Sequence, residues 1–511
     1  MSSPEWAALD RRTVAVTALL VAGGSVGAAV PAVYWITRAG SFGTALAWVL
    51  PVAALVVASA CAFDEVRWRR TRYRVTSERI DLHTGVFVSR RRSLHRDRVR
   101  TVDVTADPLL RLFGLVQVLI ATGEQTGPDG SVTLRPVTRQ VAEDLRHTLL
   151  DRASGVTADG LLARLDPAWI RYAPLSFVTP LLGGSAFGVV LNVSDWFGLQ
   201  SGVIAWVAGL FRGVPLLTTI VVLTAIALVI GLVAALGLFV EMWWAYRLDR
   251  EPGGTLRVRR GLLTTRSISL EERRLRGVEI VEPLGARLAG AARVDAVATG
   301  MAAPSEKDKT DSRTLLPAAP RAVAHRVAAD VLRDPVAPPT STPLSPHPAA
   351  ARNRRVRWAL GTVATVVALL AVLGLLLTEI LLHVAWISAF VLGPVAVLLA
   401  LDAYRSLGHG LTPGYLVARS GTVRRATVAL QRGGIIGWTA KQSIFQRRAG
   451  LLTLTATTAA GAGAYSIHDV GTSHGLAVAE RAVPDLLTPF LQVAEGRSDE
   501  RHCDEREPVR S

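Results

Sequence analysis

The stretch Asp107-Pro108-Leu109-Leu110-Arg111-Leu112-Phe113-Gly114 is predicted to contain a short helix. Aspartate suits its N-cap, and proline suits its first helical position. Its ending, Arg-x-x-Gly, occurs twice more, as Arg287-Leu288-Ala289-Gly290 and as Arg447-Arg448-Ala449-Gly450. Each arginine follows a turn glycine by the same 26 residues, the glycines being Gly85, Gly261 and Gly421. A spacing kept in three places indicates an internal repeat, so the chain is predicted to contain three related modules.

The first repeat is predicted to contain an antiparallel sheet. Short β-rich runs alternate with turn residues such as Ser77-Glu78 and Thr84-Gly85, as tight turns between neighbouring strands require. The expected strands are Tyr73–Thr76, Arg79–His83, Val86–His95, Val99–Thr105, Leu115–Ala121 and Ser131–Arg135.

Each repeat is also predicted to close with a helix. Apolar residues at every fourth position indicate amphipathic helices at Val137–Arg152 in the first repeat and at Pro320–Arg333 in the second. A similar helix is expected near Gly475–Val493, where Pro484 and Pro489 should break it.

These residues resemble a known family. The run Arg96-Asp97-Arg98-Val99-Arg100-Thr101-Val102-Asp103-Val104, followed by 107–115, is similar to the signature of bacterial pleckstrin-homology-like (PH-like) domains of the second type. The whole chain resembles the YdbT-like membrane proteins, which carry several such domains behind paired transmembrane helices. For each repeat the resemblance implies a strongly bent antiparallel β-barrel with a C-terminal helix.

The second and third repeats depart from the signature. The second keeps Glu272-Arg273-Arg274-Leu275-Arg276, and the third has Gln431-Arg432-Gly433-Gly434-Ile435, which contains no acidic residue. The resemblance therefore gives the least support for a binding role in the third repeat. Because the family's molecular function is largely uncharacterised, the resemblance implies an architecture more than an activity.

Six apolar segments meet or approach the length of about 20 residues that a membrane span needs. The predicted spans form three pairs, at Val14–Ile36, Phe42–Phe63, Leu175–Val193, Leu216–Val240, Trp358–Leu377 and Val384–Leu401. The connection Ser194–Pro215 is itself apolar, so it is expected to lie in the interface or to re-enter the membrane. A cleaved signal peptide is the alternative for the first segment, but its length and the span that follows favour an uncleaved helix.

The distribution of basic residues predicts the orientation. Although the net charge is +16, the connections within the pairs carry only Arg38 and Arg212 as basic residues. Because basic loops stay on the cytoplasmic face, both termini and all three soluble regions are predicted to be cytoplasmic, with the spans in the plasma (inner) membrane. Topology thus explains the charge better than nucleic-acid binding does.

The expected domain boundaries follow from these features. The chain is divided into helix pair 1 (1–66), PH-like domain 1 (67–155), helix pair 2 (165–242), PH-like domain 2 (243–334), a proline-rich extended linker (335–351), helix pair 3 (352–402), PH-like domain 3 (403–495) and a charged tail (496–511).

A basic cluster surrounds the third and fourth expected strands of the first repeat. Close to the end of a span, arginines are attracted to an anionic leaflet by about 1 kcal/mol each, so the cluster could bind lipid head groups or a partner protein. The alternative is that the arginines only enforce topology and solubility, or pair with Asp97, Asp103 and Asp107. The candidate surface consists of Arg90, Arg91, Arg92, Arg96, Arg98 and Arg100.

The residues that define the repeat are predicted to be structural. Recurrence at the end of a short helical turn suits a salt bridge or a carbonyl cap within the barrel, made by Arg111, Arg287 and Arg447 beside Gly114, Gly290 and Gly450.

Catalytic and metal chemistry are not expected. No set of nucleophile, base and stabiliser is visible, and the histidines lack metal-site spacing. The nearest histidine pair, His468 and His474, is interpreted as loop residues. The sequence therefore predicts no enzyme, metal or cofactor.

Two functional hypotheses follow. The first is a binding or scaffold component of the cell envelope or its stress defence, whose partners are the bilayer, anionic lipid or another protein. The second is a transporter or lipid-handling protein that uses the six spans. The lack of charged residues within the predicted spans favours the first.

Overall fold

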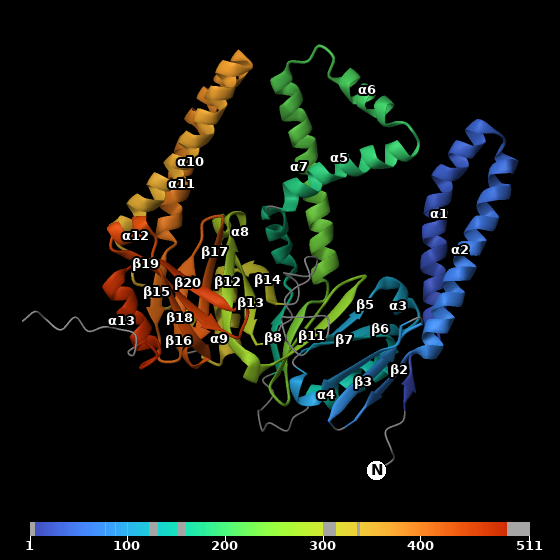
Figure 1. The fold of residues 1–511 in the computed structure, drawn as a ribbon, viewed down its shortest axis with the longest axis horizontal. Coiled ribbons are helices and arrows are strands. Elements are labelled where there is room, and N and C mark those ends of the chain that lie inside the picture. Colours follow the sequence, from blue (N-terminus) through green and yellow to red (C-terminus); the bar gives the residue numbers. More distant parts are fainter. Residues whose placement is uncertain are drawn as a thin grey trace, which may run out of the picture.

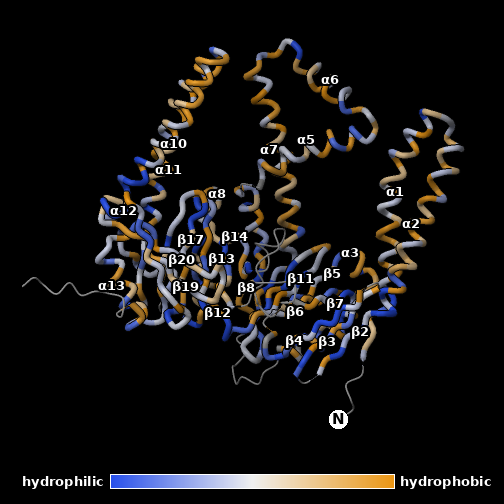
Figure 2. Tube along the Cα trace, viewed as in Figure 1, coloured by the Kyte–Doolittle hydropathy of each residue, from blue (hydrophilic) through white to orange (hydrophobic). Residues whose placement is uncertain are grey.

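The computed structural model describes residues 6–76, 78–86, 88–99, 101–121, 131–150, 160–176, 178–299, 313–334 and 338–487. Three groups of helices rise from the same side of a row of β-sheets, which lie next to one another along the molecule (Figure 1). The helices are predominantly apolar along their length, whereas the sheets mix polar and apolar residues (Figure 2). The chain therefore separates into a membrane layer and a soluble layer.

Within the described residues, five helices are long and apolar enough to cross a membrane. Their large apolar side chains remain exposed, as side chains that face lipid do. These helices are α1 (Thr13–Ala39), α2 (Phe42–Arg70), α7 (Leu216–Trp243), α10 (Ala349–Leu376) and α11 (Glu379–Arg405).

The third expected span has a different form. A 3₁₀ helix, η3 (Pro167–Leu175), is followed by α5 (Val178–Trp196), and the two are bent by 72° relative to each other. The apolar connection contains a short helix, α6 (Gln200–Leu210). A sixth crossing therefore exists only if the bent pair acts as one span.

The first module contains the strands expected from the sequence. Its first sheet has the order β1-β2-β3-β4, and α4 packs on the second half of the module. The elements are β1 (Ala7–Ala8), β2 (Arg72–Val75), β3 (Arg79–Thr84), β4 (Arg90–His95), η1 (Arg96–Arg98), β5 (Thr101–Ala106), α3 (Pro108–Leu112), β6 (Leu115–Ala121), β7 (Ser131–Thr138) and α4 (Arg139–Leu150).

The second module repeats this order of elements. It contains β8 (Gly160–Arg164), β9 (Arg247–Glu251), β10 (Thr255–Arg260), β11 (Thr265–Glu271), η4 (Glu272–Arg274), β12 (Leu275–Pro283), α8 (Leu284–Leu288), β13 (Ala291–Ala298), β14 (Thr314–Pro320) and α9 (Arg321–Leu332).

The third module follows the same order except at its start, where the 3₁₀ helix η5 and an isolated bridge from Ser345 to His409 stand in place of the first strand. Its closing helix ends just before Pro484, as the sequence predicts. Its elements are η5 (Pro339–Ser341), β15 (Gly408–Leu411), β16 (Tyr415–Ser420), β17 (Arg424–Gln431), η6 (Arg432–Gly434), β18 (Ile435–Lys441), α12 (Ile444–Arg448), β19 (Leu451–Thr458), β20 (Ala464–Gly471) and α13 (Thr472–Ala482).

Neighbouring modules share their sheets. Strand β5 of the first module pairs with β11 of the second, giving a seven-stranded sheet, and β12 of the second pairs with β17 of the third, giving a six-stranded sheet. The apolar core of the second module also includes Val417 and Ala429 of the third. The three modules are therefore joined by continuous backbone hydrogen bonding and by shared packing.

Each module takes backbone from before its own helix pair, which differs from the expected boundaries. Strand β8 precedes the second pair and hydrogen-bonds to β9 after it, and Trp169 of η3 is buried in the soluble core. In the expected linker, Thr340 and His347 are buried, and Ser345 bridges to His409 of β15. This segment is held by packing and hydrogen bonds, so it is not a free spacer.

Candidate functional site

A basic cleft lies where the first module meets the second. Strand β10 supplies much of it, because side chains alternate between the faces of a strand. Leu256 and Val258 enter the core, while Arg257 and Arg259 occupy the opposite face. Helix α4 of the first module packs near this face. The alternation Leu-Arg-Val-Arg therefore directs two guanidinium groups at the junction.

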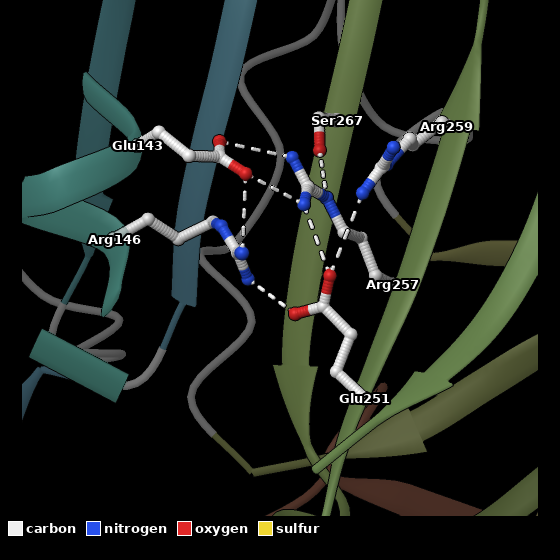
Figure 3. Close-up of polar contacts among 6 residues, drawn as sticks. All are labelled: Glu143, Arg146, Glu251, Arg257, Arg259 and Ser267. Atoms are coloured by element: carbon white, nitrogen blue, oxygen red, sulfur yellow. Dashed lines mark hydrogen bonds and ion pairs between the residues drawn. The ribbon is translucent and has the colours of Figure 1, made fainter. Parts of the chain in front are cut away.

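The floor of the junction is an ion-pair network (Figure 3). Both Nη atoms of Arg257 donate to the carboxylate of Glu143, at 2.8 and 3.1 Å, and Nη1 also donates to Glu251 Oε1 at 3.0 Å. Arg146 donates to the same two carboxylates, at 3.2 Å to Glu143 and 2.5 Å to Glu251. Because Arg146 and Arg257 are buried, both need this pairing. The four side chains fix α4 against β9 and β10.

The network sets the charge of its members. Burial alone would raise the pKa of Glu143, but the hydrogen bonds and charge of Arg257, with those of Arg146, lower it to about 2. Burial alone would likewise lower the pKa of Arg257, whereas its bonds to Glu143 and Glu251 raise it. Both carboxylates thus stay ionised and neutralise two arginines.

The cleft above this network has a volume of about 730 Å³. Seven arginines and one glutamate, Glu143, line it. Even without Arg260 and Arg266, which make further interactions, five guanidinium groups meet two carboxylates, so the cleft keeps an excess of positive charge. The lining arginines are Arg111, Arg139, Arg247, Arg257, Arg259, Arg260 and Arg266.

Three of these arginines present charge to solvent. Arg139 at the start of α4 and Arg247 at the start of β9 are exposed, and neither has an ion-pair partner within the described part of the chain. The side chain of Arg259 is 47% exposed and lies 3.6 Å from Glu251, its guanidinium nitrogen to the carboxylate oxygen. These groups can donate to an anion without breaking the network below.

The cleft lies at the end of a membrane-crossing helix. Trp244 and Ala245, which directly follow α7, belong to its lining. The guanidinium of Arg260 stacks over Trp243, 4.3 Å from the ring centre. Glu241 of α7 accepts backbone hydrogen bonds from Leu263 and Thr264, so the β10–β11 turn is fixed to the helix end. The site is thereby held at the boundary between the membrane and soluble layers.

Exposed apolar side chains occupy the same end of the modules. Leu263 of the β10–β11 turn is 58% exposed, Leu112 of α3 is 74% exposed and Leu288 of α8 is 80% exposed. Helix α3 contacts the start of α1, because Arg12 donates to the Phe113 carbonyl at 3.2 Å. Apolar residues next to basic ones at a helix end suit a membrane interface.

The basic cluster predicted from the sequence lies elsewhere. Arg90 and Arg91 are exposed on β4, and Arg92 is half-buried there. Arg96 donates to the Thr148 carbonyl in the last turn of α4, which is the role that Arg432 has at the end of α13. The side chain of Arg98 and the whole of Arg100 lie outside the described residues. The structure therefore spreads this cluster over an exposed strand and a helix cap.

Two of the three repeated arginines, Arg111 and Arg287, join modules. The sequence predicts a salt bridge or a carbonyl cap within one barrel, but Arg111 and Arg287 each bond to the following module instead. Arg111 donates to the Leu262 carbonyl of the second module at 2.7 Å. Arg287 donates to the carboxylate of Asp402 at 2.8 Å and to the Thr422 carbonyl, both in the third repeat. Arg447 is exposed, and among the described residues its side chain has no hydrogen-bond partner.

The repeated glycines share a left-handed backbone conformation. Gly114, Gly290 and Gly450 end α3, α8 and α12 with φ of +69°, +70° and +63°. Glycine adopts this region without the strain that a Cβ adds, so it ends each short helix.

Two histidines expected in loops lie in regular elements. His468 is in β20 and His474 is on α13. His474 Nε2 lies 3.0 Å from His409 Nε2, and His409 Nδ1 lies 3.1 Å from His347 Nε2. This chain of imidazoles connects the segment before α10 with β15 and α13.

Sequence reasoning did not find the cleft between the modules. The run Arg257-Val258-Arg259-Arg260 was a usable signal, because it puts several arginines just after a span. Its partner Glu143 comes from another repeat, over 100 residues earlier, as does Arg146, which bonds to Glu251 beside the run, and no local pattern indicates that meeting.

The fold and the cleft define a membrane protein with basic modules beside its spans. The model of the Bacterial PH domain family matches residues 14–153 and 359–485, just over half of the chain. The chain therefore belongs to the Bacterial PH domain family.

A curated relative agrees with this assignment. The UPF0699 transmembrane protein YdbT of Bacillus subtilis (strain 168) is 25% identical over 87 residues, which are 17% of this chain and 17% of the relative. The chain thus aligns with only a small part of that relative's length. No solved structure gives a significant match.

Proposed function

We propose that this protein is a multi-pass plasma-membrane protein whose three PH-like modules lie on the cytoplasmic side, and that its cleft binds the head group of an anionic phospholipid. The observation that carries the proposal is the excess of arginine over carboxylate in a cleft at the end of α7. Arginine is suited to phosphate because its planar fork donates two parallel hydrogen bonds.

The inferred ligand site is a set of exposed guanidinium groups above a fixed floor. Arg139, Arg247 and Arg259 would contact the phosphate, while Arg146 and Arg257 stay occupied by Glu143 and Glu251. The exposed Leu112 and Leu263 would enter the interface beside the lipid. Such a module would hold the soluble layer against an anionic leaflet.

In this proposal the protein is a non-enzymatic binding or scaffold component of the cell envelope or its stress defence. Shared sheets make the three modules a continuous platform, which suits holding partners more than turning over a substrate. The paucity of basic residues in the connections within helix pairs supports a cytoplasmic position for the modules.

The test is binding of phosphatidylglycerol to the full-length protein in neutral detergent, counted by native mass spectrometry. The double variant Arg139→Ala/Arg247→Ala should weaken binding roughly 10- to 30-fold, because each arginine contributes about 1 kcal/mol near an anionic surface. Phosphatidylcholine should bind equally weakly to both forms, since its head group carries no net charge.

The matched control is Arg79→Ala/Arg326→Ala, which removes the same charge from exposed positions outside the cleft. This control should keep the binding of the parent protein. If both double variants lose phosphatidylglycerol equally, the attraction is a property of net charge and the cleft is not the site.

A lipid-handling role is the second candidate, and the bent segment η3–α5 favours it. Interrupted helices occur where transporters place their substrate sites, and the third expected span begins at the bend between η3 and α5. Reconstituted liposomes with fluorescent phosphatidylglycerol distinguish the two. Transbilayer movement that depends on the protein would replace the scaffold proposal, whereas binding without movement supports it.

A further inference from the structure

Each internal junction pairs the last strand of a module's first sheet, β11 or β17, with a strand of the preceding module. Strand β11 receives β5 over six residue pairs, and β17 receives β12 over seven. The strand at the same position in the first module is β4. It stands at the end of its sheet, so within the described residues no further strand is paired to its outer side.

The outer side of β4 presents backbone groups in a defined pattern. Arg96 donates its N–H to the Glu78 carbonyl on the β3 side, as Glu272 does to Gly254 and Arg432 to Gly414. Because backbone groups alternate along a strand, those of Arg91, Ser93 and His95 point away from β3. All three of these residues are exposed.

The repeat fixes how a strand would align on this edge. Leu94 corresponds to Leu270 in the second module and to Leu430 in the third. Leu270 faces Thr101 of the first module, and Leu430 faces Gly277 of the second. In an incoming strand of the same register, the residue two positions after the one opposite Leu94 lies opposite Arg92. At that position β5 carries Asp103 and β12 carries Glu279.

Charge identifies the occupant. At the second junction Arg425 pairs with Glu282 through two bonds of 2.7 Å, and Arg424 donates to Glu279 at 2.9 Å. Strand β4 is rich in arginine, since Arg90, Arg91 and Arg92 follow one another. A strand that binds there must therefore supply carboxylates.

A second copy of this chain does not meet that requirement. Its open strand at the other end of the array is β18, whose sequence is Ile-Ile-Gly-Trp-Thr-Ala-Lys. In the register of the internal junctions, Lys441 would face Arg90 and Thr439 would face Arg92. Like charges directly opposite each other destabilise a strand pair.

We propose that the outer edge of β4 binds an extended acidic segment of another protein, which adds a strand to the first sheet. The backbone of Arg91, Ser93 and His95 supplies the ladder, and the arginines of β4 select carboxylates. Strand addition of this kind joins backbone hydrogen bonds to side-chain selection. The surface lies outside the cleft, so it stands or falls independently of lipid binding.

The experiment uses the full-length protein in nanodiscs of phosphatidylcholine and a fluorescein-labelled peptide that reproduces Leu275–Pro283 of β12. Fluorescence anisotropy should report saturable binding. Arg91→Pro should weaken it at least about 10-fold, because proline removes an outward N–H and obstructs the approaching strand. Arg91→Ala keeps the N–H and should weaken it by about 3-fold through lost charge.

The control peptide carries Glu279→Arg and Glu282→Arg and should not bind. Equal binding of the two peptides, or unchanged binding to Arg91→Pro, would overturn the proposal. Thermal unfolding checks that Arg91→Pro is folded, and Arg91→Ala remains a test if it is not.

Two further measurements address the other occupants. Light scattering that shows a dimer dissociated by Arg91→Pro would mean that a second copy covers β4, which contradicts the proposal. The parent protein could fail to bind the peptide, while both Arg91 variants lose binding to phosphatidylglycerol vesicles. That pair of results would assign the edge to the membrane surface instead.

Discussion

Arg257 of the second module and Glu143 of the first form a two-bond ion pair, 2.8 and 3.1 Å from guanidinium to carboxylate, across the boundary between them. The side chain of Arg257 is only 7% exposed, so it depends on carboxylates to balance its charge. Modules that are separate in sequence are thus joined by a buried charge as well as by paired strands.

Replacing Glu143 by glutamine should destabilise this junction. We expect a loss of about 1 kcal/mol in the free energy of unfolding, because the carboxylate is partly solvated and Glu251 still pairs with Arg257. The pKa of Glu143, about 2, lies below its unfolded value. Its contribution is therefore present above about pH 4.5 and lost as the pH falls towards 2. Chemical unfolding in detergent measures both effects.

The control for this variant is Asp144→Asn, which removes the neighbouring, exposed carboxylate of α4. It should leave the free energy of unfolding within about 0.5 kcal/mol. A Glu143→Gln protein as stable as this control would show that the pair does not hold the junction.

The buried His409 should make the third module sensitive to acid. Burial, with the charges of His347 and His474, lowers the pKa of His409 to about 4. In the unfolded chain this histidine takes up a proton near pH 6.5, whereas in the folded protein it does so only near pH 4. Its contribution to the free energy of unfolding is therefore fully present above pH 6.5, and about 3 kcal/mol is lost between pH 6.5 and 4. Thermal unfolding from pH 7.5 to 4.5 follows the loss.

The variant His409→Gln removes one titrating group and should reduce this pH dependence, whatever it does to stability at neutral pH. The remaining slope comes from His347 and His468, whose pKa values burial also lowers. His383→Gln, at an exposed position near the start of α11, serves as the control and should keep the parent slope. An unchanged slope in His409→Gln would exclude His409 as the source.

The repeated arginines allow a comparison within one protein. Arg287→Ala removes the ion pair with Asp402 and the bond to the Thr422 carbonyl, so we expect a loss of about 1–2 kcal/mol. Arg447→Ala, at the same place in the third repeat, should cost less than about 0.5 kcal/mol because Arg447 is exposed. Equal losses would contradict a junction role for Arg287.

The sequence predicted what local patterns control. Alternating strands and the closing helices depend on neighbouring residues, and the structure has them at the expected places. The pairing of β5 with β11 was not accessible in this way, because strand partners from different repeats share no local signal. For the same reason local patterns predict a contact of Arg111 within its own barrel, whereas it contacts Leu262 of the next module.

Two segments beside the helix pairs show a second limit of prediction from the sequence, since their structure depends on distant parts of the chain. Composition indicated an extended spacer at 335–351, since proline disfavours regular structure. Burial of Thr340 and His347 depends instead on a surface formed by residues such as His409, far along the chain. Similarly, hydropathy indicated a span at 175–193, but it does not report the bend between η3 and α5.

The left-handed glycines should resist substitution for a backbone reason. No heavy atom lies within 4 Å of a Cβ built on Gly290, so the cost of Gly290→Ala arises from its φ of +70° and should be about 1 kcal/mol. Gly433→Ala is the control, because Gly433 also has open space but no positive φ. Equal stability of the two variants would refute the conformational explanation.

Labelling of single cysteines tests the proposed orientation. In a background with Cys61→Ser and Cys503→Ser, one cysteine replaces Ser89 in the β3–β4 turn and another replaces Thr378 between α10 and α11. Both positions are exposed. Ser89 belongs to a sheet module, whereas Thr378 lies in the connection between α10 and α11, at the end of these helices away from the sheets (Figure 1). If basic residues keep the modules in the cytoplasm, an impermeant maleimide added to spheroplasts should label Thr378→Cys alone, and Ser89→Cys only after permeabilisation. Labelling of Ser89→Cys in sealed spheroplasts would place the first module outside. That result would remove the anionic cytoplasmic leaflet from reach of the cleft, and the lipid proposal would fail with it.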